Sequence, residues 1–149
     1  MSSGAPMLAA AFPEAGVLGE RLRRQGLTIS CAESCTGGLL MAALTALPGA
    51  SDYVLGGVIT YSDELKQSLL HVPEKALAEG GAVSAEVATA MAEGVLDACG
   101  SDLGLAVAGV AGPQVRIPDE SARAFRLNPR THSGESAHPA GGVIGAFAA

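Results

Sequence analysis

Short apolar runs alternate with helical segments along most of the chain, and this alternation limits the possible folds more than any other feature. Three runs rich in aliphatic residues, at 27–30, 53–61 and 103–110, have the length of buried strands. Segments with helical spacing of apolar residues separate them. Buried strands that alternate with helices form a largely parallel sheet with helices on both faces. The sequence therefore predicts an α/β domain.

The expected helices begin and end at residues that favour helix termini. Ser62 and Ser84 are candidate N-caps, and Gly26 and Gly100 follow the last periodic residue of their helices. A shorter helical turn is expected after Pro73. The main helices are expected at 14–25, 36–47, 63–70 and 85–99.

The two ends of the chain lack this regular alternation. Residues 1–13 are expected to be a flexible N-terminus, and residues 14–149 a single domain. Residues 114–138 mix Arg, Pro, Ser and Asp without a sustained period, which favours a loop insertion. One more short strand is expected at 142–147.

Charge and cysteine content limit the possible partners and the compartment. A net charge of −6 and an isoelectric point near 4.9 argue against general binding to nucleic acid or to an anionic membrane. The apolar stretches fall short of the roughly 20 residues that span a bilayer. Cys31, Cys35 and Cys99 form no disulfide framework and no complete zinc set, so we expect a cytoplasmic protein without a metal site.

Residues 31–38 carry the densest set of reactive and ligand-binding groups in the chain. They hold a carboxylate, two hydroxyls, two thiols and two glycines between a predicted strand and a predicted helix. Such a turn directs free backbone N–H groups beyond the sheet, where those from Cys35 to Gly38 could stabilise an oxyanion or hold a phosphate. We interpret the turn as an active site with Ser34 as the nucleophile. The alternative is that Ser34 is only a helix cap.

Three stretches in combination are distinctive: AESCTGG at 32–38, GGVITYSDELK at 56–66 and GAVS at 81–84. PGAS at 48–51 and GVAGP at 109–113 accompany them. Together they resemble the C-terminal domain of the CinA family of competence- and damage-inducible proteins. That family includes stand-alone nicotinamide-nucleotide amidases.

The resemblance implies a three-layer α/β/α domain with a mostly parallel mixed sheet, and a homodimer. It also implies hydrolysis of the carboxamide of nicotinamide mononucleotide to nicotinate mononucleotide and ammonia, a step of pyridine nucleotide recycling, without a cofactor. Ser34 then corresponds to the nucleophile, Lys66 to its base and Tyr61 to a further catalytic residue, whereas Asp63 replaces the usual Asn. The expected substrate contacts are Glu33, Cys35, Thr36, Gly37, Gly38, Gly109 and Gly112.

Elementary chemistry agrees with this assignment but leaves alternatives open. No histidine lies near either motif, and a lysine can serve as the base of a serine when burial disfavours its charged form. Lys66 could instead be an ordinary surface lysine. Glu33 could orient Lys66 or Thr36, or be a helix N-terminal charge favoured by the dipole. Cys35 could be mistaken for the nucleophile, since a helix N-terminus activates thiols.

Two further functions remain possible from the sequence. One is a catalytically impaired module that binds nucleotide or only a protein partner. It would be consistent with Ala108, where the family commonly has Thr or Ser, and with the apparent lack of the C-terminal strand and helix that follow the stretch at 139–146 in relatives. The other is a nucleotide-binding α/β domain of different chemistry, which would leave Tyr61 and Lys66 unexplained.

Overall fold

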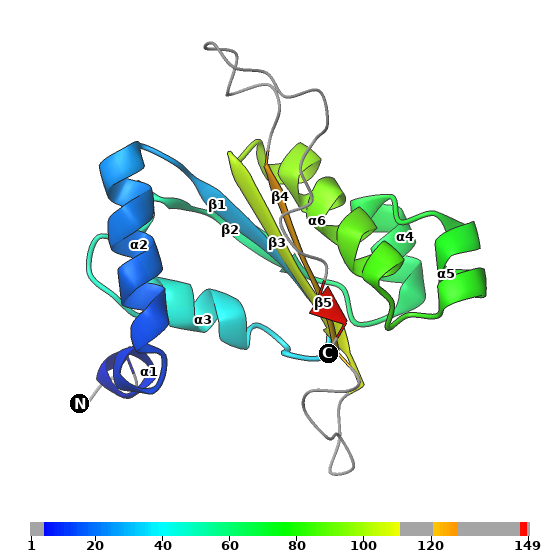
Figure 1. Cartoon of the computed structure of the whole chain (residues 1–149), viewed down its shortest axis with the longest axis horizontal. Helices are drawn as coiled ribbons and strands as arrows, with labels where there is room; N and C mark the ends of the chain where they lie inside the picture. The colour runs from blue at the N-terminus through cyan, green and yellow to red at the C-terminus, as the bar shows by residue number, and fades with distance from the viewer. Residues whose placement is uncertain (1–4, 111–120, 128–146, 149) are drawn as a thin grey trace.

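A computed structural model describes residues 5–110, 121–127 and 147–148 of the chain. These residues form one five-stranded sheet in the order β2-β1-β3-β4-β5, with helices on both sides (Figure 1). The elements are α1 (Ala5–Ala11), α2 (Pro13–Gln25), β1 (Ile29–Glu33), α3 (Leu39–Thr45), a 3-10 turn (Ala50–Asp52), β2 (Val54–Ile59), α4 (Asp63–Leu70), α5 (Glu74–Gly80), α6 (Ala85–Cys99), β3 (Leu103–Gly109), β4 (Ser121–Leu127) and β5 (Phe147–Ala148).

Strand β1 lies at the centre of the parallel part of the sheet. It pairs in parallel with β2 on one side and with β3 on the other, so that Ala32 lies between Val58 and Ala106. Strands β4 and β5 extend the sheet in antiparallel fashion beyond β3. The predicted α/β/α architecture with a mostly parallel mixed sheet is therefore confirmed.

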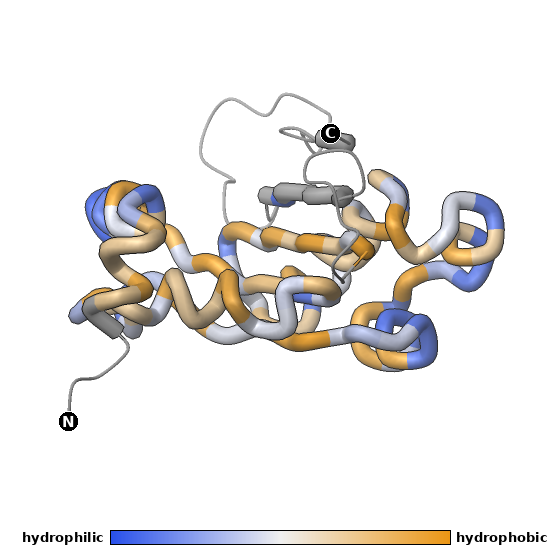
Figure 2. Tube along the Cα trace, turned by 90° about the horizontal axis from the view of Figure 1, so that it is seen from below, coloured by the Kyte–Doolittle hydropathy of each residue, from blue (hydrophilic) through white to orange (hydrophobic). Residues whose placement is uncertain are grey.

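Each face of the sheet has its own helical layer. Side chains of α2 and α3, such as Leu22 and Leu44, pack with Ile29 and Cys31 of β1 in one cluster. Side chains of α4, α5 and α6 pack with Ala32 of β1 in the other. In Figure 2 the strands are coloured mainly apolar, and the hydrophilic segments lie mostly on the outer helices. Consecutive residues of β1 thus pack against opposite helical layers.

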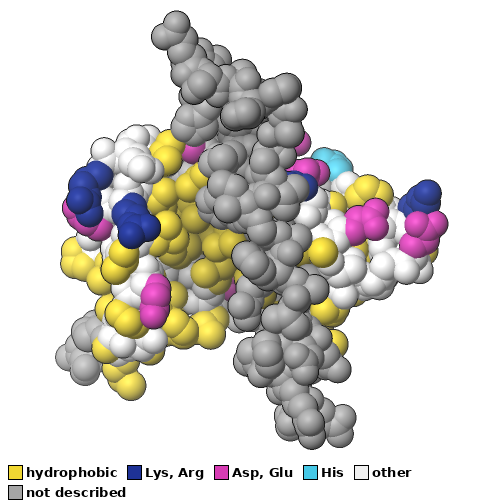
Figure 3. All heavy atoms as spheres, in the orientation of Figure 1, with side chains coloured by type: hydrophobic (Ala, Val, Ile, Leu, Met, Phe, Trp, Pro, Cys, Tyr) yellow, Lys and Arg dark blue, Asp and Glu magenta, His cyan; other side chains and the backbone are white. Residues whose placement is uncertain are grey.

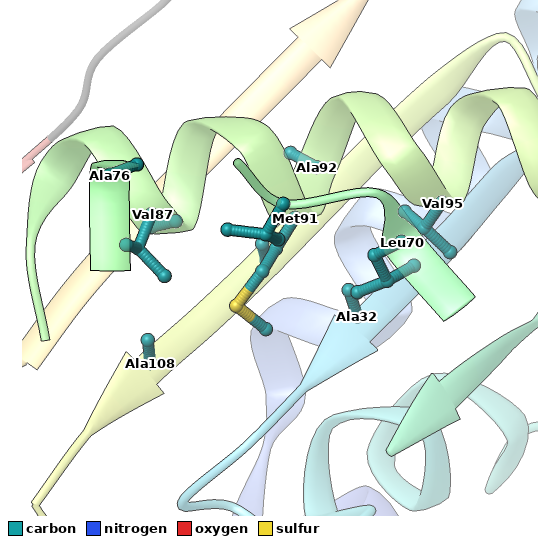
Figure 4. Packing of buried hydrophobic residues seen from close by; sticks show 11 residues of the cluster. Ala32, Leu70, Ala76, Val87, Met91, Ala92, Val95 and Ala108 are labelled. Atoms are coloured by element: carbon teal, nitrogen blue, oxygen red, sulfur yellow. The ribbon is translucent and has the colours of Figure 1, made fainter. Parts of the chain in front are cut away.

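The cluster beneath α6 is rich in alanine, which lets the helix approach the strands closely. Figure 4 shows Val87, Met91, Ala92 and Val95 of α6 over the sheet, with Leu70 near Ala32. All these side chains are almost fully buried. Leu70 at the end of α4 thereby joins the same cluster as Ala32 of β1.

The expected helix ends agree well with the structure. Ser62 accepts a hydrogen bond from the Leu65 N–H at 3.2 Å, and Ser84 accepts one from the Val87 N–H at 3.2 Å. Gly26, with φ of 65°, ends α2 in the left-handed region as predicted. Helix α3 spans 39–45 and not the expected 36–47, and it begins late because Gly37 and Gly38 have φ of 59° and 106° and cannot belong to a right-handed helix.

The structure differs from the expected extent of elements at three places. The first strand continues to Glu33, because β1 is paired on both sides up to that residue, so the turn begins at Ser34 and not at Cys31. Residues 5–11 form α1, a helix that the sequence did not predict, in agreement with their high alanine content. Residues 121–127 form β4 within the expected loop 114–138.

Strand β4 is held by pairing and by a charge contact. It runs antiparallel to β3 from Ser121 to Leu127, and the Arg126 Nε lies 3.0 Å from the Glu93 Oε1 on α6. The remaining residues of the expected loop lie outside the described part, as do most of those in the strand expected at 142–147. None of the helices in the described residues is both long and apolar enough to cross a membrane.

Candidate active site

Glu33 ends β1 and holds the following turn through its carboxylate. The residue has no exposed surface. Its Oε2 accepts hydrogen bonds from the Thr36 hydroxyl at 2.6 Å, the Gly38 N–H at 3.1 Å and the Leu40 N–H at 3.0 Å, and its Oε1 accepts one from the Met41 N–H at 2.8 Å. The carboxylate thus caps α3 and orients Thr36, two of the roles considered from the sequence.

The backbone of the turn uses part of its hydrogen-bonding capacity internally. The Ser34 N–H donates to the Val107 carbonyl at 3.0 Å, and the Gly37 N–H donates to the Ser34 carbonyl at 3.1 Å. The Gly38 N–H is bound to Glu33. Of the four N–H donors expected between Cys35 and Gly38, only those of Cys35 and Thr36 have no acceptor among the described residues. These two remain candidates for an oxyanion or a phosphate.

Ser34 is the first residue beyond β1 and lies largely buried, with 6% of its surface exposed. Its hydroxyl has no hydrogen-bond partner within the described part of the chain. Side chains alternate between faces along a strand, and Ala32 faces the α6 layer whereas Glu33 contacts α3. The Ser34 N–H continues the ladder with β3, so this alternation places the Ser34 side chain on the α6 side.

Lys66 of α4 has a side chain that is only 2% exposed, which excludes the alternative of a solvated surface lysine. Its Nζ donates to the Tyr61 carbonyl at 2.9 Å and lies 3.5 Å from the Asp63 Oδ1. One helical turn later, Leu70 packs in the same cluster as Ala32. Residues i and i+4 share a helix face, so Lys66 lies on the same buried side of α4 as Leu70.

Tyr61 takes part in the site through its backbone. The residue is 65% exposed, and its phenol makes no hydrogen bond to any residue that the structure describes. Its carbonyl, in contrast, is an acceptor for Lys66. A catalytic role for the phenol therefore stays a prediction, and the exposed ring is available to contact a ligand.

Thr60 was not singled out from the sequence, although the structure places it beside the turn. It follows β2 directly, and its N–H donates to the Glu33 carbonyl at 2.8 Å. The residue is fully buried, and its hydroxyl has no hydrogen-bond partner among the described residues. Its position immediately before Tyr61 at the end of a predicted strand was the signal that could have identified it.

The remaining residues predicted to contact the substrate, and the cysteine before them, lie in different places. Gly109 ends β3, at the same carboxyl edge as Ser34, whereas Gly112 lies outside the described residues. Cys35 is half-buried in the turn. Cys31 lies beneath α3, where burial, followed by the charge of Glu33, raises the pKa of its thiol to about 12. Cys31 is thus an inert core residue.

Two further findings concern other kinds of site, a metal site and an apolar pocket. Within the described ranges, no group of three or more His, Cys, Asp or Glu side chains is arranged to hold a metal ion. An apolar hollow of about 310 Å³ lies between α2 and α3 and is lined mainly by Ala15, Leu18, Leu40 and Leu44. Hydrophobic side chains also gather around the α2 and α3 side in Figure 3. No predicted site residue lines this hollow.

Comparisons with known proteins agree on one family. A family model described as "CinA C-terminal domain" matches residues 13–122. A CinA-like protein of Citrifermentans bemidjiense is 54% identical over 99 residues, which cover 66% of this chain and 24% of the relative. A CinA-like protein of Myxococcus xanthus is 51% identical over 106 residues, covering 71% of this chain and 25% of the relative. The chain thus spans about a quarter of the length of these relatives.

Solved structures show the same fold. The competence/damage-inducible protein CihA from Agrobacterium tumefaciens has 35% sequence identity and a TM-score of 0.70, over 76% of this chain and 71% of that one. The competence damage-inducible protein A from Klebsiella pneumoniae has 34% identity and a TM-score of 0.71, over 76% of this chain and 73% of that one.

Proposed function

The chain belongs to the CinA C-terminal domain family, and on this premise we propose that it is an amidohydrolase acting on nicotinamide mononucleotide. The products are nicotinate mononucleotide and ammonia, as expected for an enzyme of pyridine nucleotide recycling. The observation that carries the proposal is the burial of Lys66 on α4, one helical turn before Leu70, which packs in the same cluster as Ala32 of β1, two residues before Ser34. A buried amine and an unpartnered serine hydroxyl are the two groups that a Ser–Lys hydrolase requires.

The first half of the reaction forms an acyl-enzyme. Ser34 Oγ attacks the carboxamide carbon of the substrate while its proton passes to the neutral Lys66 amine. The carbonyl oxygen becomes an oxyanion, for which the Cys35 and Thr36 N–H groups are the available donors. The tetrahedral intermediate then collapses. The C–N bond breaks, Lys66 returns the proton to the leaving nitrogen, and ammonia departs.

The second half releases the acid. A water molecule attacks the ester carbon of the acyl-Ser34 and gives a proton to Lys66. The bond to Ser34 Oγ then breaks, and the proton on Lys66 returns to that oxygen. Nicotinate mononucleotide leaves, and both side chains regain their starting state. In this scheme Glu33 is a positioning residue, because its carboxylate is occupied by four donors of the turn and of α3.

We also propose that the active form is a homodimer in the cytoplasm. Strand β2 is an edge of the described sheet, and the side chains of Leu55 and Ile59 on it are each about half exposed, at 51% and 50%. An apolar sheet edge of this kind is suited to contact with a second copy. A monomeric mass in solution, measured by light scattering, would contradict the dimer. The free thiols of the chain suit a reducing compartment.

Ammonia release from nicotinamide mononucleotide tests the enzymatic proposal. We expect activity in the purified protein and a loss of about 1,000-fold or more in Ser34→Ala. The matched control is Ser68→Ala, which removes an exposed hydroxyl from α4. Activity that survives Ser34→Ala would exclude Ser34 as the nucleophile. A folded wild-type protein without activity would contradict the proposal and favour the non-catalytic binding module.

A further inference from the structure

The Lys66 amine has two polar neighbours, and only one of them carries a charge. Its Nζ donates to the Tyr61 carbonyl at 2.9 Å and lies 3.5 Å from the Asp63 Oδ1. Among the described residues, no other acidic side chain comes within ion-pair distance of this amine. The proposed mechanism assigns Lys66 as the base and gives Asp63 no role. Asp63 is nevertheless the side chain that acts most directly on the charge of Lys66.

The other titratable groups around α4 form no ion pair with Lys66 in the described part of the chain. Helix α6 packs beside α4 (Figure 1), and its titratable side chains are Glu86, Glu93, Asp97 and Cys99. The charged side chains of α5, at positions 74, 75 and 79, are exposed. The Glu33 carboxylate is occupied by donors of the turn and of α3. Glu64 is exposed, and its pKa is lowered first by hydrogen bonds from its own backbone and from the Ser62 side chain and only then by Lys66.

The surroundings of Asp63 favour a negative charge on its side chain. Asp63 is the first residue of α4 after the Ser62 cap, and the N-terminus of a helix stabilises a carboxylate. Its side chain is 51% exposed, so water stabilises the charge as well. The Lys66 side chain, in contrast, is only 2% exposed, and the charged form of its amine depends on protein partners. A carboxylate at 3.5 Å is such a partner.

We propose that Asp63 is a positioning residue that stabilises the ammonium formed when Lys66 accepts the proton of Ser34, an inference that rests on the proposed function. As Ser34 Oγ bonds to the carboxamide carbon, its O–H bond breaks and the lone pair of the Lys66 amine takes the proton. The new positive charge then lies beside the Asp63 carboxylate. An aspartate stabilises the imidazolium of a Ser-His-Asp triad in the same way.

The pH profile of kcat/KM separates this role from a structural one. Asp63→Asn keeps the size of the side chain and removes its charge. Without the carboxylate, less of Lys66 is protonated at a given pH, so activity should reach half of its plateau at a pH about one unit lower. The neutral amine is then also a weaker base, so the plateau at high pH should fall about threefold. A residue with only a structural role would lower activity without moving the profile.

Glu64→Gln is the matched control, because it removes a charge from the same first turn of α4. Glu64 forms no ion pair with Lys66, and its exposed charge is screened by solvent. We expect the pH of half-maximal activity in Glu64→Gln to stay within about 0.3 unit of the wild type. Equal shifts in the two variants would overturn the inference, since the general charge of the helix end would then explain both.

A substrate-independent readout distinguishes failure of the inference from failure of the proposed function. Lys66 and Lys75 are the only lysines of the chain, so NMR of the lysine ¹³Cε groups can follow each of them through a pH titration. In Asp63→Asn the Lys66 resonance should change at a pH about one unit lower, whereas that of Lys75, which is 79% exposed on α5, should not move. This result without hydrolysis of nicotinamide mononucleotide by the wild type would support the action of Asp63 on Lys66 and reject the substrate. An unmoved Lys66 titration, or a moved one with an unmoved activity profile, would overturn the inference.

Discussion

Glu33 and Ser34 are neighbours in the chain, yet their side chains lie on opposite faces of the sheet and differ in their hydrogen bonding. The Glu33 carboxylate on the α3 side accepts four hydrogen bonds and leaves neither oxygen free. On the α6 side, the hydroxyls of Ser34 and Thr60 have no partner among the described residues. The difference indicates that the α3 side of the turn contributes to stability, whereas the hydroxyls on the α6 side are available for catalysis. Variants on the two sides should therefore affect different measurements.

The largest expected effect is on activity and comes from Lys66. Lys66→Met removes the amine and keeps an apolar side chain of similar length. We expect kcat/KM for nicotinamide mononucleotide to fall about 1,000-fold, equivalent to about 4 kcal/mol. The free energy of unfolding should stay the same or rise, because a hydrophobic side chain avoids the cost of burying the polar amine.

Lys75→Met is the matched control for this variant. The Lys75 side chain on α5 is 79% exposed and lies 3.9 Å from Glu79, so its loss should change neither activity nor stability by a measurable amount. If Lys66→Met lost stability and kept its activity, Lys66 would belong to the structural side of the comparison. The division of the turn into a stabilising side and a catalytic side would then be wrong.

The second prediction concerns the stabilising side. Glu33→Ala leaves the Thr36 hydroxyl and the N–H groups of Gly38, Leu40 and Met41 without their acceptor. Since each buried unsatisfied donor costs about 1–3 kcal/mol and water will satisfy some of them, we expect a loss of about 3 kcal/mol in the free energy of unfolding. Urea denaturation followed by circular dichroism measures it.

Glu20→Ala is the matched control, because it removes a glutamate that is 52% exposed and paired with Arg23 on the surface of α2. Exposed pairs contribute about 0–1 kcal/mol, so this variant should remain close to the wild type. Glu33→Gln should lie between the two, since an amide retains one acceptor oxygen. A Glu33→Ala protein as stable as Glu20→Ala would mean that water replaces the carboxylate at little cost.

The same contrast explains what the sequence could predict. The spacing of apolar residues and the caps at Ser62 and Ser84 located α4 and α6, because these signals are local. The turn and Lys66 could be identified from motifs. The burial of Thr60 could not, since it depends on the pairing of β2 with β1 and on the packing of α4. Likewise, β4 depends on β3 as a partner, and its arginines obscured the strand pattern.

The smallest predicted effect is a pH dependence on the Glu33 side of the sheet. Burial, and then the charge of Glu33, raises the pKa of the Cys31 thiol from 9.0 to about 12. An unfolded chain therefore loses this proton at a lower pH than the folded protein does. The contribution of Cys31 to stability is fully present below pH 9 and declines as the pH rises from about 9 toward 12.

Between pH 9 and pH 10 this linkage should remove about 1 kcal/mol from the free energy of unfolding. Lysines and tyrosines titrate in the same range, so the informative quantity is the difference between the wild type and Cys31→Ala. Urea denaturation at several pH values should show Cys31→Ala to be less stable at pH 8, because a buried sulfur is lost, but with a shallower decline above pH 9. Parallel declines in the two proteins would show that Cys31 does not titrate differently on folding. The side of the turn around Glu33 would then influence stability through its hydrogen bonds alone.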